Sequence, residues 1–376
     1  MELRIGTFNV ENLFDRPRAM GREPNPEVLA AHARFGAAIA EVEYAERVRR
    51  EILECLEILG LLRSDSAAYA RLRQVRGRLI RRPRTGDPEI VARGRSDWVG
   101  WAELTDERVD ELAITHLGQV IREVGAHILA LVEAENRIVA KQFTDAELCD
   151  VEGEPLYPHV MVIDGNDERG IDVGVISRGG WPVRSIRSHV DDLGPDGRRI
   201  FSRDCPVFTY DFPAGTALEG QRLHVLANHF KSKGYGRQAD NDRTRTRQAT
   251  RVAEIYRELR DAGEDFVVVA GDLNDTPQRP PLAPLLTGTD LREIATLDGF
   301  DDGGRPGTYG NGTKSQKIDY LLLSPALAER TTGGAIFREG VWGGRNGTLF
   351  PHFPTMTAPE HAASDHAALY ADIDVG

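Results

Sequence analysis

The stretch of sequence that decides the fold is VVVAGDLNDTP, residues 267–277. Its first four residues are typical of a buried strand, and the glycine, polar residues and proline that follow mark the end of that strand. Asp272 and Asn274 are two residues apart there, so their side chains share one face. Ligands of α/β proteins bind at strand ends of this kind, although Asp and Asn near a proline also form turns or cap helices. The stretch therefore indicates an α/β fold with a candidate polar site.

Short apolar runs of strand length recur along the chain, each bounded by Gly, Pro, Asn or Asp. These predicted strands are Leu3–Val10, His127–Val132, Val160–Ile163, Ile171–Ile176, Val207–Phe212, Leu223–Ala227, Phe266–Ala270, Ile318–Leu323 and Ala367–Ile373. Apolar residues spaced by three and four predict helices over Thr105–Val124 and Asp242–Arg260. Strands covered by helices on one face and by a second sheet on the other predict an α/β layered sandwich.

Residues 15 to about 104 do not follow this pattern. Pro26–Leu62 predicts one or two helices and Ser66–Ile80 predicts another, with an Arg/Pro/Gly-rich break at Arg81–Pro88. We interpret the region as a helical insertion into a single domain of residues 1–376. Two interpretations of its arginines stay open: they are solvated side chains of an ordinary helical cap, or they contact substrate.

Charge is unevenly distributed in this chain of 376 residues, whose net charge is −12. Residues 71–95 hold nine arginines against two acidic residues, and residues 228–251 hold seven Lys or Arg against two. The remainder is strongly acidic, so we do not expect the whole surface to bind polyanions. Any nucleic-acid footprint is expected to be narrow.

The three cysteines, Cys55, Cys149 and Cys205, are too few and too scattered for a disulfide framework or a thiolate metal site. The N-terminus has no charged-then-apolar signal segment, and no apolar run approaches the roughly 18 residues of a membrane helix. These features predict a soluble protein of a reducing, cytoplasmic compartment that does not associate with membranes.

Six further polar clusters lie at or beside the predicted strands. They contain Asn9, the pair Glu133 and Glu135, the run Asp167–Asp172, the run Asn228–Lys233, Asp319, and the pair Asp365 and His366. Each cluster alone is compatible with a turn or a cap, but a charge inside an apolar run, such as Asp319, requires a partner or a ligand. Oxygen ligands with few histidines and no thiolates favour Mg²⁺ or Mn²⁺ over zinc.

The ordered set of Asn9, Glu133, Gly271–Asn274, Asp319 and Ser364–His366 resembles the endonuclease/exonuclease/phosphatase superfamily. That group includes DNase I-like nucleases, abasic-site endonucleases, sphingomyelinases and inositol polyphosphate 5-phosphatases. The resemblance extends over residues 4–373, interrupted by the insertion. It implies a four-layer α/β sandwich, in which two mixed β-sheets pack face to face between outer helices.

The resemblance also implies roles for individual residues. The implied metal ligands are Asn9, Glu133 and Asp365. The implied catalytic residues are His366 as acid/base, Asp319 to orient it, Asp272 and Asn274 to position water and phosphate, and His229 to bind the phosphate. The expected phosphate-binding residues are Arg169, Lys231 and Asn228. Arg169 and the nearby Asp172 match the family pattern less securely than the other residues do.

One residue departs from the family pattern, because Val132 stands where the family has Gln before the metal glutamate. The change removes an expected hydrogen bond to the ligand, and it leaves the ligand itself in place. Glu135 is an alternative to Glu133 as the metal ligand.

The implied activity is divalent-metal-dependent hydrolysis of a phosphodiester by in-line attack of water. DNA or RNA is the preferred substrate class, because Asn228–Lys233 resembles nuclease-like members and several arginines follow it. Arginines in the first turns of a helix oppose its dipole, which fits a surface kept for phosphates; an Arg-rich composition is the simpler alternative. A small-molecule phosphodiesterase or phosphatase remains open, and so does a non-catalytic binding protein. The oligomeric state stays open as well.

Overall fold

The computed structural model describes residues 1–11, 25–105, 110–167, 170–234 and 237–376. The chain divides into two compact units. Unit 1 consists of Met1–Phe14 and Asp110–Gly376, and unit 2 consists of Asp15–Val109. In the described parts of both units, every helix is too short or too polar to cross a membrane.

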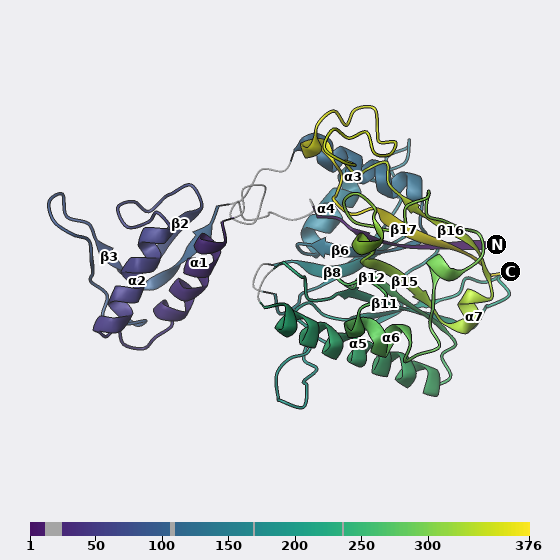
Figure 1. Ribbon diagram of the computed structural model, residues 1–376, viewed down its shortest axis with the longest axis horizontal. Coiled ribbons are helices and arrows are strands. Elements are labelled where there is room, and N and C mark those ends of the chain that lie inside the picture. The colour runs from purple at the N-terminus through teal and green to yellow at the C-terminus, as the bar shows by residue number, and fades with distance from the viewer. Residues whose placement is uncertain (12–24, 106–109, 168–169, 235–236) are drawn as a thin grey trace. The chain divides into compact units, whose positions relative to one another are not determined.

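Unit 1 is built on two β-sheets (Figure 1). The seven-stranded sheet has the spatial order β14 (Phe300–Asp301), β16 (Thr331–Phe337), β17 (Ala368–Asp374), β1 (Glu2–Asn9), β6 (Ile128–Ala134), β8 (Asp172–Ser177) and β7 (His159–Ile163). The six-stranded sheet has the order β13 (Arg292–Glu293), β15 (Asp319–Leu323), β12 (Phe266–Asp272), β11 (Arg222–His229), β10 (Val207–Asp211) and β9 (Ser185–Arg187). Both sheets are mixed, because β1 runs parallel to β6 and β11 runs parallel to β12 beside antiparallel neighbours.

The two sheets pack face to face through alternate residues of their strands. Ile5 of β1 and Ile128 of β6 share one apolar core with Val225 of β11 and Val268 of β12. Successive side chains of a strand point to opposite faces, so the residues between these point outward. Those outward residues meet the helices.

Helices cover the outer face of each sheet (Figure 1). The seven-stranded sheet is covered by α3 (Glu111–Val124) and α4 (Arg137–Glu147), and the six-stranded sheet by α5 (Gln238–Asp261) and α6 (Ala283–Leu286). The short helix α7 (Pro325–Ala328) follows β15. The predicted four-layer α/β sandwich is therefore confirmed.

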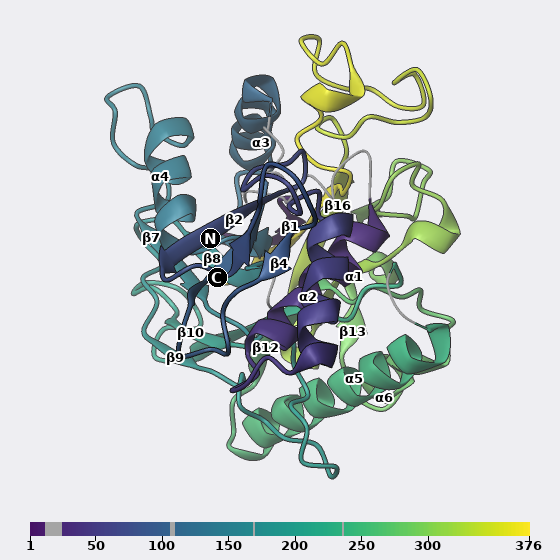
Figure 2. The same ribbon diagram turned by 90° about the vertical axis from the view of Figure 1, so that its left-hand side faces the viewer.

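Unit 2 has a hydrophobic core of its own. It contains α1 (Pro26–Ile39), α2 (Glu46–Ile58), a ladder of β2 (Ala70–Arg76) with β5 (Val99–Leu104), and a short ladder of β3 (Ile80–Arg81) with β4 (Glu89–Ile90). Figure 2 shows α1 and α2 packed side by side. Phe35, Ile52, Leu72 and Trp98 are buried together in this core.

All nine predicted strands are present in the described chain, but the predicted helix over Ser66–Ile80 is wrong. That segment contains β2, in which Ala70 and Leu72 are buried while Arg71 and Arg73 are exposed. A period of two is the pattern of a half-buried strand. The alternation was visible in the sequence, and the arginine-rich composition obscured it.

Candidate active site

The candidate site lies where strands from both sheets meet. Asp272 continues the inward-facing series of Val268 and Ala270 at the end of β12. His229 ends β11, and the parallel register sets it opposite Asp272. The antiparallel register of β12 with β15 sets Asp319 opposite Asp272 on the other side. Strand pairing alone thus brings three polar residues together at the ends of three neighbouring interior strands of the six-stranded sheet.

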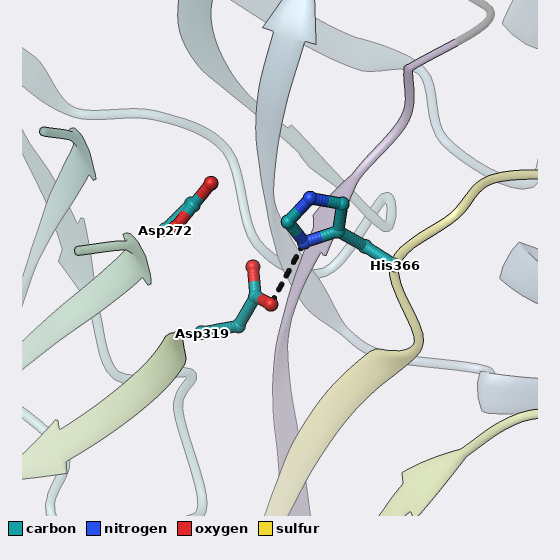
Figure 3. A group of neighbouring side chains, drawn as sticks. All are labelled: Asp272, Asp319 and His366. Atoms are coloured by element: carbon teal, nitrogen blue, oxygen red, sulfur yellow. Dashed lines mark hydrogen bonds and ion pairs between the residues drawn. The ribbon is translucent and has the colours of Figure 1, made fainter. Parts of the chain in front are cut away.

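His366 completes this group from the loop that leads into β17 (Figure 3). One donor atom from each of Asp272, Asp319 and His366 lies within 4.8 Å of the others. His366 Nδ1 is 2.8 Å from Asp319 Oδ2. Burial alone would lower the pKa of His366, but the charge and hydrogen bond of Asp319 raise it well above its usual range. The arrangement favours the imidazolium form of His366 beside Asp319.

The pKa of Asp272 is also raised, but for a carboxyl group a raised pKa favours the neutral form. Burial, followed by the nearby charge of Asp319, raises the pKa of Asp272 to about 8. The backbone N–H of Asn274 donates to Asp272 Oδ1 over 2.8 Å, and the Asn274 side-chain amide donates to Oδ2 over 3.0 Å. Burial and the neighbouring Asp319 therefore outweigh the hydrogen bonds that favour the charged form of Asp272.

Glu133 reaches the site through an irregularity of β6. The register between β6 and β8 shifts between Val132 and Ala134, and Glu133 has φ 64°. A bulge of this kind turns one side chain away from the regular alternation. As a result, Glu133 Oε1 lies 3.6 Å from His229 Nε2, which is itself 3.8 Å from Asp272 Oδ2.

The end of β1 is joined to the loop that carries His366. The Ser364 hydroxyl donates to the Asn9 carbonyl oxygen over 2.7 Å and accepts from the His366 backbone N–H at 3.0 Å. Asn9 Nδ2 and Asp365 Oδ1 lie 3.5 Å and 3.7 Å from His366 Nε2. Glu11 accepts the Asp365 backbone N–H at 2.8 Å. Glu11, two residues beyond Asn9, received no role from the sequence, and the structure places it beside Asp365.

Backbone strain is concentrated in the same place. Among the described residues, those other than glycine with positive φ are Glu11, Glu133 and Asn274. Such conformations persist only where the surroundings impose them, and they cluster at functional sites. Gly271 has φ 133°, and a Cβ there would collide with the backbone of Asn228. Glycine is thus required just before Asp272.

The donor atoms of the site fit a hard divalent cation. Asp319, Asp365 and the side-chain amide of Asn9 lie around His366, and Glu133 and Asp272 lie around His229. Oxygen donors of this kind suit Mg²⁺ or Mn²⁺. A cation would also favour the charged form of Asp272, whose pKa is raised by burial and by the nearby charge of Asp319. The tightest group is Asp272, Asp319 and His366, whereas the predicted ligands lie around His366 and His229.

Two of the three predicted phosphate-binding residues, Asn228 and Lys231, are among the described residues. Asn228 faces outward on β11, on the side of Leu226, and donates to the Leu226 carbonyl oxygen over 3.0 Å. Lys231 follows β11, and its backbone N–H donates to Gln248 of α5 over 2.9 Å. Arg169 lies outside the described residues. The proposed roles of these residues stay predictions.

A buried arginine connects two loops of the site. Arg245 of α5 is fully buried, and its Nε lies 3.1 Å from Asp275 Oδ2. Its Nη1 donates to the Lys231 carbonyl oxygen over 2.9 Å, and it also pairs with Asp242. Lys233 Nζ lies 3.0 Å from Asp275 Oδ1. Arg245 therefore holds together the loops that follow His229 and Asn274.

Arg257 of α5 donates to the Gly288 carbonyl oxygen, whereas four other arginines, in α5 or at its N-cap, pair with carboxylates. Their partners are Asp240 for Arg237 and Arg243, Asp196 for Arg247, and Asp192, Glu254 and Glu258 for Arg251. This helix was interpreted as a surface kept for phosphates. Its arginines instead serve contacts within unit 1, so their spacing gives no separate support for nucleic-acid binding.

Asp172 lies beside the bulge of β6, where it pairs in register with Ala134. Burial is the largest cause that raises the pKa of Asp172 to about 6, and the Gly165 N–H, donated over 2.8 Å, opposes it. Arg203, which is buried, lies next to it and pairs with Asp167 at 2.9 Å. The sequence offered no signal for Arg203, because it follows no predicted strand.

Comparison with known proteins gives one match to a family model. The model described as Endonuclease/Exonuclease/phosphatase family matches residues 78–301, more than half of the chain. The matched segment contains Glu133, His229, Asp272 and Asn274. A search of curated proteins finds no match.

Several solved structures resemble the chain weakly. An endonuclease/exonuclease/phosphatase family protein from Bacteroides thetaiotaomicron is 14% identical, with a TM-score of 0.49 over 69% of this chain and 88% of that one. TDP2 from Caenorhabditis elegans is 14% identical, with a TM-score of 0.47 over 70% and 90%. Sphingomyelinase C from Streptomyces griseocarneus is 19% identical, with a TM-score of 0.45 over 69% and 92%. The family assignment rests on the family model.

Proposed function

The chain belongs to the endonuclease/exonuclease/phosphatase family of phosphoester hydrolases, and we propose that it is a divalent-metal-dependent nuclease that cleaves phosphodiester bonds of DNA or RNA. One observation supports the proposal above all. Donor atoms of Asp272, Asp319 and His366 lie within 4.8 Å of one another, where strand ends of the two packed sheets come together. Glu133 and His229 adjoin them. Paired carboxylates and imidazoles at a strand edge suit the hydrolysis of a charged ester.

Asn9, Glu133 and Asp365 are the proposed ligands of Mg²⁺ or Mn²⁺, with Asp272 close to them. When bound, the cation supplies neutralisation of the phosphate charge and a Lewis acid. The concentration of buried negative charge around Asp272 supports this assignment.

His366 and Asp319 are proposed to act as a unit. The bond between Nδ1 and Asp319 sets the orientation of the ring, so Nε2 is the nitrogen that can hold or transfer a proton. Because the pKa of His366 is raised, the imidazolium persists at neutral pH and can donate a proton to the leaving oxygen or stabilise its charge. His229 is proposed to bind the phosphate.

Asp272 and Asn274 are proposed to orient the attacking water and the phosphate. The two hydrogen bonds from Asn274 fix both carboxylate oxygens of Asp272. Water adds to phosphorus, the P–O bond to the leaving alcohol breaks, and one proton passes from the water to the departing oxygen. Fixed groups of this kind lower the barrier because they need no rearrangement during the reaction.

A small-molecule phosphodiesterase is the second candidate, and one observation favours it. The arginines of α5, which a nuclease would use for phosphates beyond the scissile one, are paired with carboxylates of unit 1. A compact substrate does not need such contacts.

The two candidates differ in which substrates they cleave. The purified chain is incubated with Mg²⁺ or Mn²⁺ and with single-stranded DNA, double-stranded DNA, RNA or bis-p-nitrophenyl phosphate, with and without EDTA. A nuclease cleaves at least one polymer, and EDTA stops it. Cleavage of the ester alone supports the small-molecule candidate. Failure on every substrate, with metal binding verified by calorimetry, would contradict both.

A matched pair of variants connects the activity to the site. Asp272→Asn is expected to abolish cleavage, since it removes a buried carboxylate of the cluster. Asp211→Asn removes an exposed carboxylate that pairs with Arg184, and it is expected to leave cleavage unchanged.

A further inference from the structure

The ladder of β2 and β5 in unit 2 has one buried face and one exposed face. Ala70, Leu72 and Ala102 point into the core of the unit. Arg71 and Arg73 alternate with them and are exposed. In a two-stranded ladder, the side that faces away from the core is covered only by its own side chains. We call this side the outer ladder face.

Apolar side chains lie among the arginines of the outer ladder face. Trp101, directly opposite Arg73 in the register, is 47% exposed. Val99 is 41% exposed, and Val75, which lies at the register shift of β2, is 66% exposed. Trp101 is also the one tryptophan among the exposed large hydrophobic side chains of the described residues. An exposed aromatic ring flanked by apolar residues indicates a binding surface.

The arginines of this face are incompletely neutralised. Arg73 pairs with Glu103 at 2.7 Å. Arg71 and Arg76 form no ion pair with any carboxylate of the described chain, and the same holds for Arg78 just beyond β2. Elsewhere in unit 2, Arg81 pairs with Glu89 and Arg93 with Asp97, whereas Arg84 and Arg95 form no ion pair within the described chain. What distinguishes the outer ladder face is that its unpaired arginines lie on the same strands as the exposed Trp101.

We propose that the outer ladder face binds a single-stranded segment of nucleic acid, with a base stacked on Trp101 and phosphates paired with Arg71, Arg73 and Arg76. This proposal rests on the proposed nuclease function and names the form of its substrate. Single strands expose base faces, and an aromatic platform beside cationic side chains recognises them without sequence preference. A duplex would use the arginines but would leave Trp101 without a partner.

The position of unit 2 in the chain agrees with a substrate-binding role. Its residues are inserted after the strand that ends at Asn9, a proposed metal ligand, and before α3. A polymer offers many phosphates besides the one being cleaved, so a second attachment surface raises its effective concentration at the site. A small ester gains nothing from such a surface.

The proposal is tested by binding of a fluorescein-labelled 20-nucleotide oligo(dT) to the full chain, measured by anisotropy in Ca²⁺ or without metal. The background is Asp272→Asn, which prevents turnover. Trp101→Ala is expected to weaken binding roughly 5- to 100-fold, because stacking contributes about 1–3 kcal/mol per base. Trp101→Phe is expected to retain most of the affinity.

The charge contribution is tested by its salt dependence. Replacing Arg71, Arg73 and Arg76 by Ala is expected to reduce the slope of log affinity against log salt by about 2, since each phosphate contact on a single strand contributes about 0.7. The matched control replaces Arg63, Arg81 and Arg93, which are equally exposed in unit 2 but paired with Asp87, Glu89 and Asp97. The control is expected to leave the slope unchanged.

The outcomes separate this proposal from the proposed function. Equal affinity of Trp101→Ala and its parent for oligo(dT) overturns the outer ladder face, even if the wild-type chain hydrolyses bis-p-nitrophenyl phosphate. Competition by poly-glutamate as strong as that by oligo(dT) also overturns it, because the face would then recognise acidic protein. Binding that depends on Trp101, in a wild-type chain that hydrolyses no phosphodiester, supports the face and contradicts the nuclease. Circular dichroism verifies that each variant is folded.

Discussion

Helix α5 and strand β2 both carry dense runs of arginine, yet the structure uses the two runs differently. Arg245 of α5 is fully buried between Asp242 and Asp275, and Arg247 pairs with Asp196. Arg71 of β2 is exposed and forms no ion pair within the described chain. Local charge density was similar in the two segments. What separates them is the presence of carboxylates brought from distant parts of the sequence.

The difference has energetic consequences. A buried ion pair loses the hydration of both charges, so removing one partner leaves the other uncompensated and destabilises the fold. An exposed arginine keeps its hydration and contributes little to stability, but its charge remains available to a polyanion. Arginines of α5 therefore organise the site in unit 1, while those of β2 are suited to a ligand.

The largest expected effect tests whether unit 1 holds all of the chemistry. His366→Ala and Asp319→Asn are expected to lower kcat on bis-p-nitrophenyl phosphate about 10²- to 10⁴-fold, because each breaks the hydrogen-bonded pair that would hold the proton. Glu51→Gln, at an exposed ion pair of unit 2, is the control and should keep full activity. His366→Ala with activity within threefold of wild type would remove His366 from the site.

The second-largest expected effect concerns the buried arginine of α5, Arg245. Arg245→Met is expected to lower the free energy of unfolding of unit 1 by about 3–5 kcal/mol, because Asp275 loses its buried partner and keeps only the more exposed Lys233 and Arg279. Urea unfolding monitored by circular dichroism measures this change. The double variant Arg245→Met/Asp275→Asn should recover part of the loss, since it removes the uncompensated charge. No recovery would mean that packing, and not charge, dominates at this position.

A third prediction concerns the independence of the two units. Ile52 is fully buried in the core of unit 2, so Ile52→Ala is expected to destabilise that unit by about 2–5 kcal/mol. Because unit 1 has its own cores, its unfolding transition and the hydrolysis of bis-p-nitrophenyl phosphate should be unchanged. Differential scanning calorimetry resolves the transitions. A joint shift of both would show that the units unfold together.

The smallest change in stability is expected at Arg243, two residues before Arg245 on α5. Arg243 is exposed and, among the described residues, forms an ion pair only with Asp240, one helical turn away. Arg243→Met should change the free energy of unfolding by less than about 1 kcal/mol, as is usual for exposed pairs. The same urea titration measures it beside Arg245→Met. Equal losses at the two positions would contradict the distinction between buried and exposed arginines.

Much of the candidate site could be predicted because strand ends are visible in the sequence. Asp272 and Asp319 follow or begin apolar runs, and the alternation of strand side chains places both on the inner face. The same rule would have excluded Asn228, which is one residue out of phase with His229. Glu133 breaks the rule through a bulge, and bulges leave no reliable mark in a single sequence.

The sequence by itself determined the layered α/β architecture, the positions of nine strands along the chain and most of the polar residues at their ends. These depend on local periodicity and on turn residues, which act over a few positions. Only the tertiary structure decided which charges are neutralised. Arg245 meets Asp275 across 30 positions of the chain, while Arg71 meets no carboxylate in the described chain. Ion pairing depends on distances of a few ångströms between side chains, and folding alone sets those distances.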